Sequence, residues 1–518
     1  MAEDSLSVSV EQPAKKAYTT KTLTMHLWSI GAIAEFMLYV PFGFLVQPIF
    51  MLEFQLNPIL IGWAQALPRL VDGFLDPVWG HWSDTSRSRW GRRRPFILAS
   101  SFIGAFIIAG MWWASPTWSQ KALFVWVLLA NFLVFTFYGI FSTTHLALGY
   151  ELSDDFNERA RVLAIRGFYG SVPGLISLYW LAQWLAHPQT KIRWLDQCFA
   201  RHENWFGNPI NGIRWVGALM GLCAMIAGLI PVLACRERFK WAAQRKHVNL
   251  WQAFKATIRV RAFVVVLLLQ FAQTLGGMLW QQISFYILVF SLCAGMRDPK
   301  QAASWLGMPG SWLGFGWGFV MMFLAAPICK VIGKRGGIIL NYGIGALNAL
   351  LLPFFMRPGY YWVYLGFTLA FIPLQGIGGT FMNAVMPDIC DIDELESGER
   401  REGLFIAVLN WMSKLQNSII TVIAGYLLVW IGFNQKLDVQ PPEVVSRLRF
   451  WGMGMMIVGT VLAFAISWMM PITAKQMAEV RAKLDERHRR LAAEAAERER
   501  QGGPPVAEEG LEKAGADA

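Results

Sequence analysis

The stretch from Gly217 to Cys235 reads GALMGLCAMIAGLIPVLAC and contains no charged side chain. Two further runs have the same character, VVVLLLQFAQTLGGMLW at 264–280 and GMGMMIVGTVLAFAISWMM at 452–470. Each run is about long enough for a helix of roughly 20 residues to cross a bilayer. In lipid the backbone must satisfy its own polar groups, so such segments fold as helices. The sequence therefore predicts an all-α membrane protein.

The whole chain has the composition of such a protein. Of its 518 residues, 55% are hydrophobic and only 16% are charged, whereas about a quarter of a soluble domain is charged. The apolar runs predict about twelve membrane spans, at residues 24–50, 57–82, 95–114, 120–148, 161–186, 211–235, 261–293, 305–332, 337–357, 360–388, 403–432 and 449–471.

Basic residues predict how these spans are oriented. Arginine and lysine gather after even-numbered spans, as in residues 87–94, 236–246 and 330–335. Cytoplasmic loops carry such an excess, so we expect the even-numbered loops and both termini in the cytoplasm. This bias also explains the net charge of +11, and it requires no nucleic-acid partner.

The longest cytoplasmic connection, residues 236–260, divides the spans six and six. We expect an N-terminal six-helix bundle at 1–235 and a C-terminal six-helix bundle at 261–475. Two related halves around a central cavity are a common plan of secondary transporters. In the remaining segment, 476–518, apolar residues at helical spacing predict a cytoplasmic helix up to about residue 500, and the composition beyond it is that of a disordered tail.

One predicted span carries charges in its interior. The stretch RLVDGFLDPVWGHWSD at 69–84 places Arg69, Asp72 and Asp76 at positions i, i+3 and i+7, on one helix face. Ionisable groups at membrane depth usually face the bundle interior or a water-filled path. Two carboxylates and one guanidinium leave one negative charge, which Na⁺, Li⁺ or H⁺ can neutralise. The alternative is an Arg–Asp clamp that only holds helices together.

Charges also fall in other spans. Glu35 lies in the first span, Arg166 in the fifth and Lys414 in the eleventh. Glu35 and Lys414 come from different halves, so both can face one central cavity. Arg166 can instead extend its charged end to the cytoplasmic boundary. His145, in the fourth span, suits a packing role as well as a ligand role.

Two long motifs resemble the signatures of a known family. RLVDGFLDPVWGHWSDTSRSRWGRRRPFIL at 69–98 and MPDICDIDELESGERREGLFIAVLNWMSKLQ at 386–416 are similar to those of the glycoside–pentoside–hexuronide:cation symporters (melibiose-permease-like) of the major facilitator superfamily. A third patch, ELSDDFNERARVLAIRGFYG at 151–170, also resembles this family. The resemblance extends over nearly all of residues 1–475 and implies the major facilitator fold.

The resemblance also implies roles for individual residues. Asp72 and Asp76 match the carboxylate pair that binds the coupling cation, the single place where a metal ion (Na⁺) is expected. The implied substrate-binding residues are Glu35, Arg69, Arg166 and Lys414. A cytoplasmic charge network that latches the inward side, and binds no ligand, is implied for Asp84, Arg92, Asp388, Asp391, Arg400 and Arg401.

The chain departs from the family pattern in two places. Its fourth span reads YGIFSTTHLALGYELSDD at 138–155 and has neither an acid nor a tryptophan in its membrane part, where the model member of the family uses both to bind a galactoside. The first-span carboxylate is glutamate where that member has aspartate, and the extra methylene moves the contact. A specific galactoside therefore does not follow.

These observations predict a secondary active transporter of the plasma membrane, the inner membrane of a bacterium. We expect symport of a sugar or glycoside with Na⁺ or H⁺ by alternating access, in a monomer that needs the lipid bilayer and no cofactor beyond the coupling ion. The sequence shows no Walker-type phosphate loop, metal-spaced His/Cys set or nucleophile elbow, so an enzyme is not expected. Two alternatives stay open, a lysolipid symporter of the same fold and a transport-silent membrane sensor.

Overall fold

The computed structural model describes residues 21–86, 88–152, 156–175, 209–235, 237, 255, 257–294, 299–375, 378–398, 402–437 and 439–500. Helices dominate this part of the chain, and no strand occurs within it. The helices of the N-terminal half are α1 Thr22–Ser29, α2 Gly31–Phe44, α3 Val46–Leu52, α4 Pro58–Thr85, α5 Arg94–Gly110, the 3-10 turn η1 Met111–Trp113, α6 Gln120–Tyr150, α7 Phe156–Leu175 and α10 Pro209–Ala234.

The helices of the C-terminal half follow in the same manner. They are α12 Arg261–Gln273, η2 Thr274–Met278, α13 Leu279–Ile287, η3 Leu288–Leu292, α14 Pro299–Phe355, α15 Tyr361–Gln375, α16 Gly378–Ser397, α17 Glu402–Ile431, α18 Pro442–Ser467 and α19 Ala474–Arg500. The segments η2 and η3 are π-helical turns, so α12 to η3 form one nearly continuous rod.

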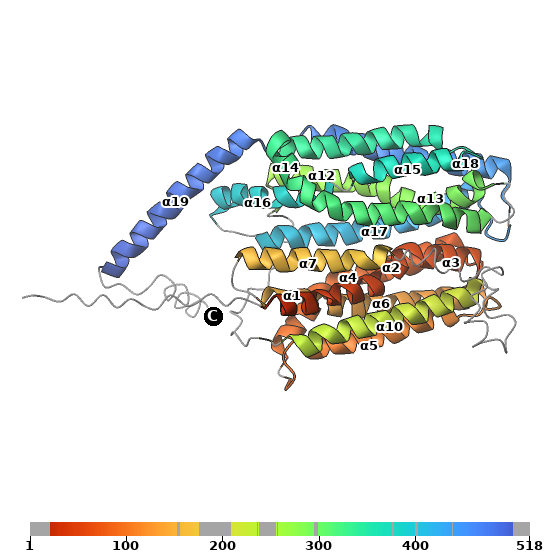
Figure 1. The fold of residues 1–518 in the computed structure, drawn as a ribbon, viewed down its shortest axis with the longest axis horizontal. Helices are drawn as coiled ribbons and strands as arrows, with labels where there is room; N and C mark the ends of the chain where they lie inside the picture. The colour runs from red at the N-terminus through yellow and green to blue at the C-terminus, as the bar shows by residue number, and fades with distance from the viewer. Residues whose placement is uncertain are drawn as a thin grey trace, which may run out of the picture.

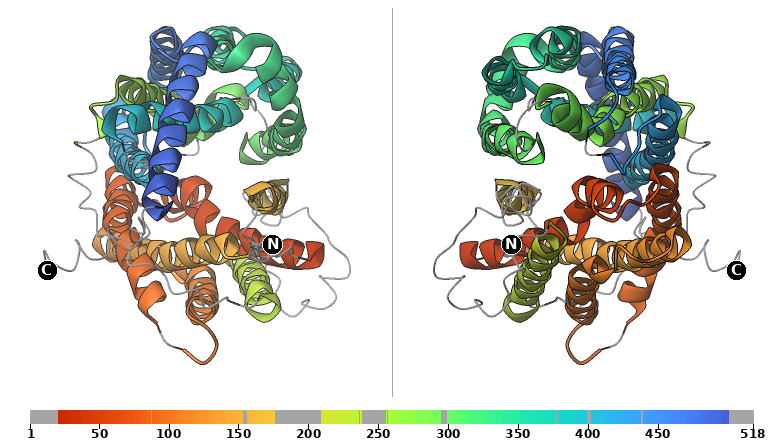
Figure 2. Two further views of the ribbon diagram at one scale, coloured as in Figure 1. Left: turned by 90° about the vertical axis from the view of Figure 1, so that its left-hand side faces the viewer. Right: turned by 90° about the vertical axis from the view of Figure 1, so that its right-hand side faces the viewer.

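The helices run side by side in two groups. Those up to α10 lie in the lower group of Figure 1 and those from α12 to α18 in the upper group, with α4, α7 and α17 near the middle. The end-on views of Figure 2 show the same division. Helices α4 and α17 pack along each other, and α7 packs on α14, so both halves contribute to the contact between the groups. The exact domain boundaries remain a prediction.

Seven helices of the described residues are long and apolar enough to cross a membrane. They contain or overlap the predicted third, fourth, sixth, seventh, ninth, eleventh and twelfth spans. Helix α4, the second span, is not among them because Arg69, Asp72 and Asp76 lower its mean hydropathy. Large apolar side chains on the outer faces are exposed, for example Phe106, Leu129 and Leu233, as lipid-facing positions require. The total of twelve spans and the cytoplasmic termini remain predictions.

Several spans differ in detail from their predicted form. The first, predicted as one segment at 24–50, consists of α1, α2 and α3. The eighth and ninth are joined in α14, where Gly333 has φ 70° and ψ 167° and marks the kink between two helices. The tenth is formed by α15 and α16. The fifth is helical as far as Leu175, and the rest of it lies outside the described residues. The segment of the predicted C-terminal helix is helical as α19, and its cytoplasmic location stays a prediction.

Sequence features at the start of α4 fix its position. The side-chain oxygen of Asn57 accepts a hydrogen bond from the backbone N–H of Ile59 at 2.9 Å, and Pro58 occupies the first helical turn. Close to this end α4 meets α17 backbone to backbone. A Cβ atom on Gly425 would lie 2.5 Å from the Pro58 carbonyl oxygen, and one on Gly62 would lie 3.0 Å from that of Thr421. Only glycine permits this approach, so the two halves are tightly closed at this end.

Candidate functional site

The charged face of α4 points toward α6 and α17. Asp72 is almost completely buried, with 1% of its surface exposed. Its Oδ1 atom lies so close to α6 that a Cβ on Gly139 would come within 2.9 Å of it, and the same Cβ would lie 3.5 Å from Oδ1 of Asp76. Both carboxylates therefore face one place on α6, and the missing side chain of Gly139 makes room for them.

Lys414 of α17 lies between these two carboxylates. Its Nζ atom is 2.7 Å from Oδ2 of Asp72 and 2.6 Å from Oδ2 of Asp76. The lysine stem packs beside Gly73 of α4, where a Cβ would lie at a van der Waals distance of 3.6 Å from Cδ of Lys414. The structure thus places Lys414 at the carboxylate pair, and its ammonium group is the counter-charge that links the two halves at this depth.

Arg69 lies on the other side of Asp72. Its Nη1 atom is 3.9 Å from Oδ2 of Asp72, and its Nη2 atom donates a hydrogen bond to the Tyr39 hydroxyl at 3.2 Å. The guanidinium carbon lies 4.8 Å from the ring centre of Tyr39 and 5.0 Å from that of Phe135. Cation–π contacts of this kind hold an arginine in place. Counting Lys414, the cluster has two positive and two negative groups.

A second charged cluster joins α2, α6 and α7. Oε2 of Glu35 accepts a hydrogen bond from Nη2 of Arg166 at 2.5 Å, and Oε1 accepts one from the Ser142 hydroxyl at 2.9 Å. Arg166 thus pairs with a carboxylate of α2, and its role in substrate binding stays a prediction. Tyr39, one helical turn beyond Glu35 on α2, contacts Arg69 and packs its ring 5.2 Å from that of Tyr138. This tyrosine connects the two clusters.

His145 has a packing role in this structure. Its ring stacks on Trp28 at 4.8 Å and on Phe141 at 5.3 Å between ring centres. Its Nε2 atom is 3.0 Å from the carbonyl oxygen of Trp28, and a Cβ on Gly31 would collide with the ring. The imidazole is completely buried, with Nδ1 3.9 Å from Glu35. The imidazole ring therefore packs beside the Glu35 carboxylate.

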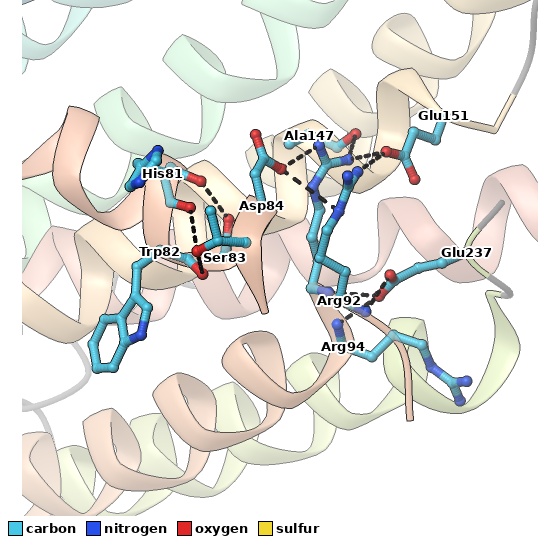
Figure 3. Close-up of polar contacts among 12 residues, drawn as sticks. His81, Trp82, Ser83, Asp84, Arg92, Arg94, Ala147, Glu151 and Glu237 are labelled. Carbon is cyan, nitrogen blue, oxygen red and sulfur yellow. Dashed lines mark hydrogen bonds and ion pairs between the residues drawn. The ribbon is translucent and has the colours of Figure 1, made fainter. Parts of the chain in front are cut away.

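The predicted charge network of the N-terminal half joins the end of α4, the start of α5 and the end of α6 (Figure 3). Arg92 donates to Oε1 of Glu151 at 2.6 Å, and Arg93 donates to the same atom at 2.6 Å and to Oδ1 of Asp84 at 2.9 Å. Arg92 also lies 3.7 Å from Asp84. Burial raises the pKa of Glu151 although both arginines act to lower it. The network connects α4, α5 and α6 within one half.

Glu237, from the central loop, caps the start of α5. Its carboxylate accepts hydrogen bonds from the backbone N–H groups of Arg92, Arg93 and Arg94 at 2.5, 2.8 and 2.7 Å (Figure 3). An acidic group at a helix N-terminus satisfies otherwise unpaired donors and complements the helix dipole. Gly91 has φ 110°, and a Cβ there would lie 2.7 Å from the Glu237 carboxylate. Glycine is therefore required at this position.

The C-terminal half has a corresponding network. Asp388, which is buried, accepts hydrogen bonds from Lys334 at 2.7 Å and from Arg481 of α19 at 2.8 Å. Arg481 also lies 3.6 Å from Asp391. Farther along α19, His488 is 2.8 Å from Glu394. Helix α19 is thus docked on α16 by charge pairs. Arg400 and Arg401 lie outside the described residues.

Several contributors to the site were not predicted from the sequence. Phe135, Gly139 and Ser142 lie at positions i, i+4 and i+7 of α6, so helical spacing alone puts them on one face. A motif search for charged residues does not detect them, because none is charged. Tyr39 follows Glu35 by one helical turn, so helical spacing alone also puts these two residues on one face of α2. Glu237 lacked any local pattern, since its partners are backbone groups distant in sequence.

A family model described as MFS/sugar transport protein matches residues 27–474. The chain belongs to the MFS/sugar transport family. The expected resemblance to the glycoside–pentoside–hexuronide:cation symporters of the major facilitator superfamily is thereby confirmed. Members are membrane transporters, and this chain is an integral, multi-pass protein of the bacterial plasma membrane.

Curated relatives of this MFS/sugar transport chain include two named transporters. It is 23% identical to a glucuronide carrier protein homologue of Escherichia coli (strain K12), over 89% of this chain and 94% of that protein. It is 22% identical to an isoprimeverose transporter of Lactiplantibacillus pentosus, over 77% of this chain and 78% of that protein.

Solved structures also share this fold. A bacterial homologue of the human lysosomal transporter Spinster, inward-facing and unoccupied, aligns with a TM-score of 0.59 at 16% identity, over 86% of this chain and 96% of that one. The nucleoside transporter NupG aligns with a TM-score of 0.59 at 13% identity, over 88% of this chain and all of that one. At these identities the likeness supports the major facilitator fold alone.

Proposed function

We propose that this protein carries a sugar or glycoside across the plasma membrane together with Na⁺ or H⁺, by alternating access. The observation that carries the proposal is the pair of buried Asp72 and partly exposed Asp76 on α4, which is joined to the opposite half through Lys414. Buried carboxylates are costly unless they are paired with a positive group. A mobile cation that replaces the lysine at this pair changes the contact between the halves.

The cation step follows from charge balance. With Lys414 at 2.7 and 2.6 Å from the two carboxylates and Arg69 beside Asp72, the two negative charges are already balanced. Na⁺ prefers oxygen ligands, and the two carboxylates supply them once the ammonium group moves away. A proton can neutralise one carboxylate in the same manner. In either case Lys414 is released toward the central space, where its three N–H groups can donate to a substrate.

The sugar step uses the second cluster. A carboxylate that accepts and a guanidinium that donates are suited to neighbouring hydroxyl groups of a sugar, and aromatic rings pack on its apolar face. Glu35 and Arg166 supply the first pair, and Tyr39 and Tyr138 supply rings beside it. Because Tyr39 also contacts Arg69, a shift of Tyr39 when the sugar binds also moves Arg69 in the cation cluster. Coupling of this kind is reciprocal: the cation raises sugar affinity by the factor by which sugar raises cation affinity.

The packing of α4 and α17 supports alternating access. These helices touch backbone to backbone near Pro58 and Gly425, and Trp63 donates a hydrogen bond to the Tyr426 hydroxyl at 3.4 Å beside that contact. At the opposite end of α4, a Cβ on Gly80 would meet no atom within 4 Å. The predicted orientation makes the closed end the outer one, which supports an inward-facing arrangement. Rocking of the halves would then exchange the closed end.

The proposal is tested by uptake into proteoliposomes that contain the purified full-length protein. A panel of labelled glycosides, pentoses and hexuronates is offered with an inward Na⁺ gradient, an inward H⁺ gradient or neither. We expect one gradient to drive accumulation of at least one sugar, and Asp72→Asn to abolish the gradient dependence. Glu443→Gln, which removes an exposed carboxylate on α18, is the matched control and should behave like the wild type. Uptake that ignores both gradients, or gradient dependence that survives in Asp72→Asn, would refute the proposal.

A further inference from the structure

A cavity lies in the C-terminal half, and none of its lining residues belongs to the charged clusters. It has a volume of about 680 Å³ and is formed by η3, the end of α14, the start of α18 and the loops beside them. This is the end of the bundle opposite to α19, on the right in Figure 1. Most of its lining is apolar, including Phe290, Pro353, Val445, Met453 and Ile457. Cavities of this size hold small organic ligands.

One cationic side chain lines this apolar cavity. Among the described residues, Arg449 of α18 donates a hydrogen bond from Nη2 to the Met356 carbonyl oxygen at 3.1 Å, which leaves further N–H donors of its guanidinium for a ligand. The positive charge of Arg357 acts on it from nearby. None of the described lining residues is a carboxylate. Two like charges beside an apolar cavity without a lining counter-ion favour an anionic ligand.

The cavity wall also holds a buried hydroxyl group. Ser291 is 1% exposed, and its Oγ atom has no hydrogen-bond partner among the described residues. A buried hydroxyl without a partner costs free energy. A ligand oxygen in the cavity would provide one. Ser291 and Arg449 therefore supply polar contacts to a ligand whose remaining surface is apolar.

Aromatic side chains indicate the depth of the cavity in the membrane. Trp451 and Phe450 follow Arg449 directly, and Trp430 packs against Trp451 with 5.0 Å between ring centres. Phe450 is 70% exposed and lines the cavity. Tryptophan is enriched at the membrane–water interface, where lipid headgroups lie. The guanidinium group thus lies near headgroup level, and the apolar wall extends from it along α18.

We infer that this cavity is a binding site for one anionic phospholipid. The lipid phosphate lies at Arg449, a headgroup or ester oxygen contacts Ser291, and an acyl chain lies along Met453 and Ile457. Arginine is suited to phosphate because its N–H groups bind two oxygens at once. The site is separate from the proposed transport site and does not depend on it.

The charge part of the inference is tested by native mass spectrometry of the delipidated full-length protein in detergent. Palmitoyl-oleoyl phosphatidylglycerol and palmitoyl-oleoyl phosphatidylcholine are titrated in parallel. We expect the wild type to bind the anionic lipid at least tenfold more tightly than the zwitterionic one, and Arg449→Gln to lose this preference. Arg447→Gln is the matched control, because Arg447 lies on the same helix, is exposed and pairs with Glu443. Equal affinity for both lipids in the wild type, or equal loss in both variants, would overturn the inference.

The cavity part is tested by a variant that keeps the charge. Gly454 lines the cavity, and a Cβ there would meet no atom within 4 Å, so Gly454→Leu fills the space without a collision. We expect at least a tenfold loss of phosphatidylglycerol binding with an unchanged size-exclusion profile. Gly345→Leu, at a glycine of α14 with equally open surroundings, should bind like the wild type. Unchanged binding in Gly454→Leu would overturn the inference, as would full competition by an equimolar amount of glycerol phosphate, since a small anion would then be the ligand.

Discussion

Replacing Lys414 by glutamine gives a sharp prediction about the cation site. In the structure Lys414 contacts both carboxylates of α4, and together with Arg69 it balances their two negative charges. The glutamine side chain has similar length and no charge. Arg69 remains, at 3.9 Å from Asp72, so the cluster in the variant carries one net negative charge. A site of that charge should bind a cation more tightly than the wild type does.

The magnitude follows from the contacts that a cation must replace. Lys414 makes one charge-assisted hydrogen bond, to Asp76, and one close ion pair, with Asp72. A hydrogen bond to a charged group contributes about 1.5–3 kcal/mol. Since each 1.4 kcal/mol corresponds to about a factor of ten, loss of this contribution predicts a rise in cation affinity of roughly one to two orders of magnitude.

Isothermal titration calorimetry with the purified protein in detergent measures Na⁺ affinity at constant ionic strength. In a separate experiment, the protons exchanged with solvent on mixing with Na⁺ are measured, which reports the protons that the site holds. We expect Lys414→Gln to bind the coupling cation with a dissociation constant far below that of the wild type. Lys436→Gln, which removes an exposed lysine, controls for net charge. A folded Lys414→Gln protein whose affinity for Na⁺ and for protons is unchanged or weaker would refute the reasoning.

Three further predictions concern other parts of the structure. Glu35→Gln should weaken sugar binding at least tenfold while cation binding persists, because the Glu35 carboxylate lies in the second cluster. Calorimetry with the sugar and with the cation measures the two affinities separately. Parallel loss of sugar and cation binding would contradict the assignment of Glu35 to the sugar site. Gly91→Ala should lower the unfolding free energy by about 1–3 kcal/mol, because φ is 110° and the added Cβ would collide with Glu237. Thermal unfolding measures the loss of stability, and Gly110→Ala, at a glycine with open surroundings, is the control. Gly425→Ala should separate α4 from α17 at their closed end, since its Cβ would lie 2.5 Å from a carbonyl oxygen. The measurement is the reaction rate of an impermeant maleimide with a thiol introduced by Ala66→Cys, at a buried position of α4, and this rate should rise several-fold. An unchanged rate would show that the contact does not close this end.

Local patterns in the sequence predict the helices and the main charged face. The i, i+3, i+7 spacing of Arg69, Asp72 and Asp76 needs only the helical repeat, and the structure places all three at one cluster. The apolar runs likewise predict long helices. The breaks within the first span were missed, because hydropathy reports the burial of a segment and not the continuity of its backbone.

Contacts between distant segments could not be predicted in this way. The sequence assigned Lys414 to the substrate, and the structure places it between Asp72 and Asp76, because the closed contact of α4 and α17 sets its distance from them. Gly139 matters only through its closeness to Asp72, which depends on how α4 packs on α6. Glu237 caps α5 because it lies just after the end of α10, a helix that packs along α5. Each of these depends on tertiary packing rather than on local sequence.

The central claim is that a cation bound at Asp72 and Asp76 moves with the sugar. It is tested most directly by the current that a sugar pulse evokes in proteoliposomes adsorbed on a solid-supported membrane, with Na⁺ present or absent at two pH values. The account predicts a sugar-evoked current in the wild type that depends on one of these cations and is lost in Asp72→Asn while the variant still binds the sugar. A current of equal size in Asp72→Asn, or one in the wild type that is independent of both Na⁺ and pH, would contradict it.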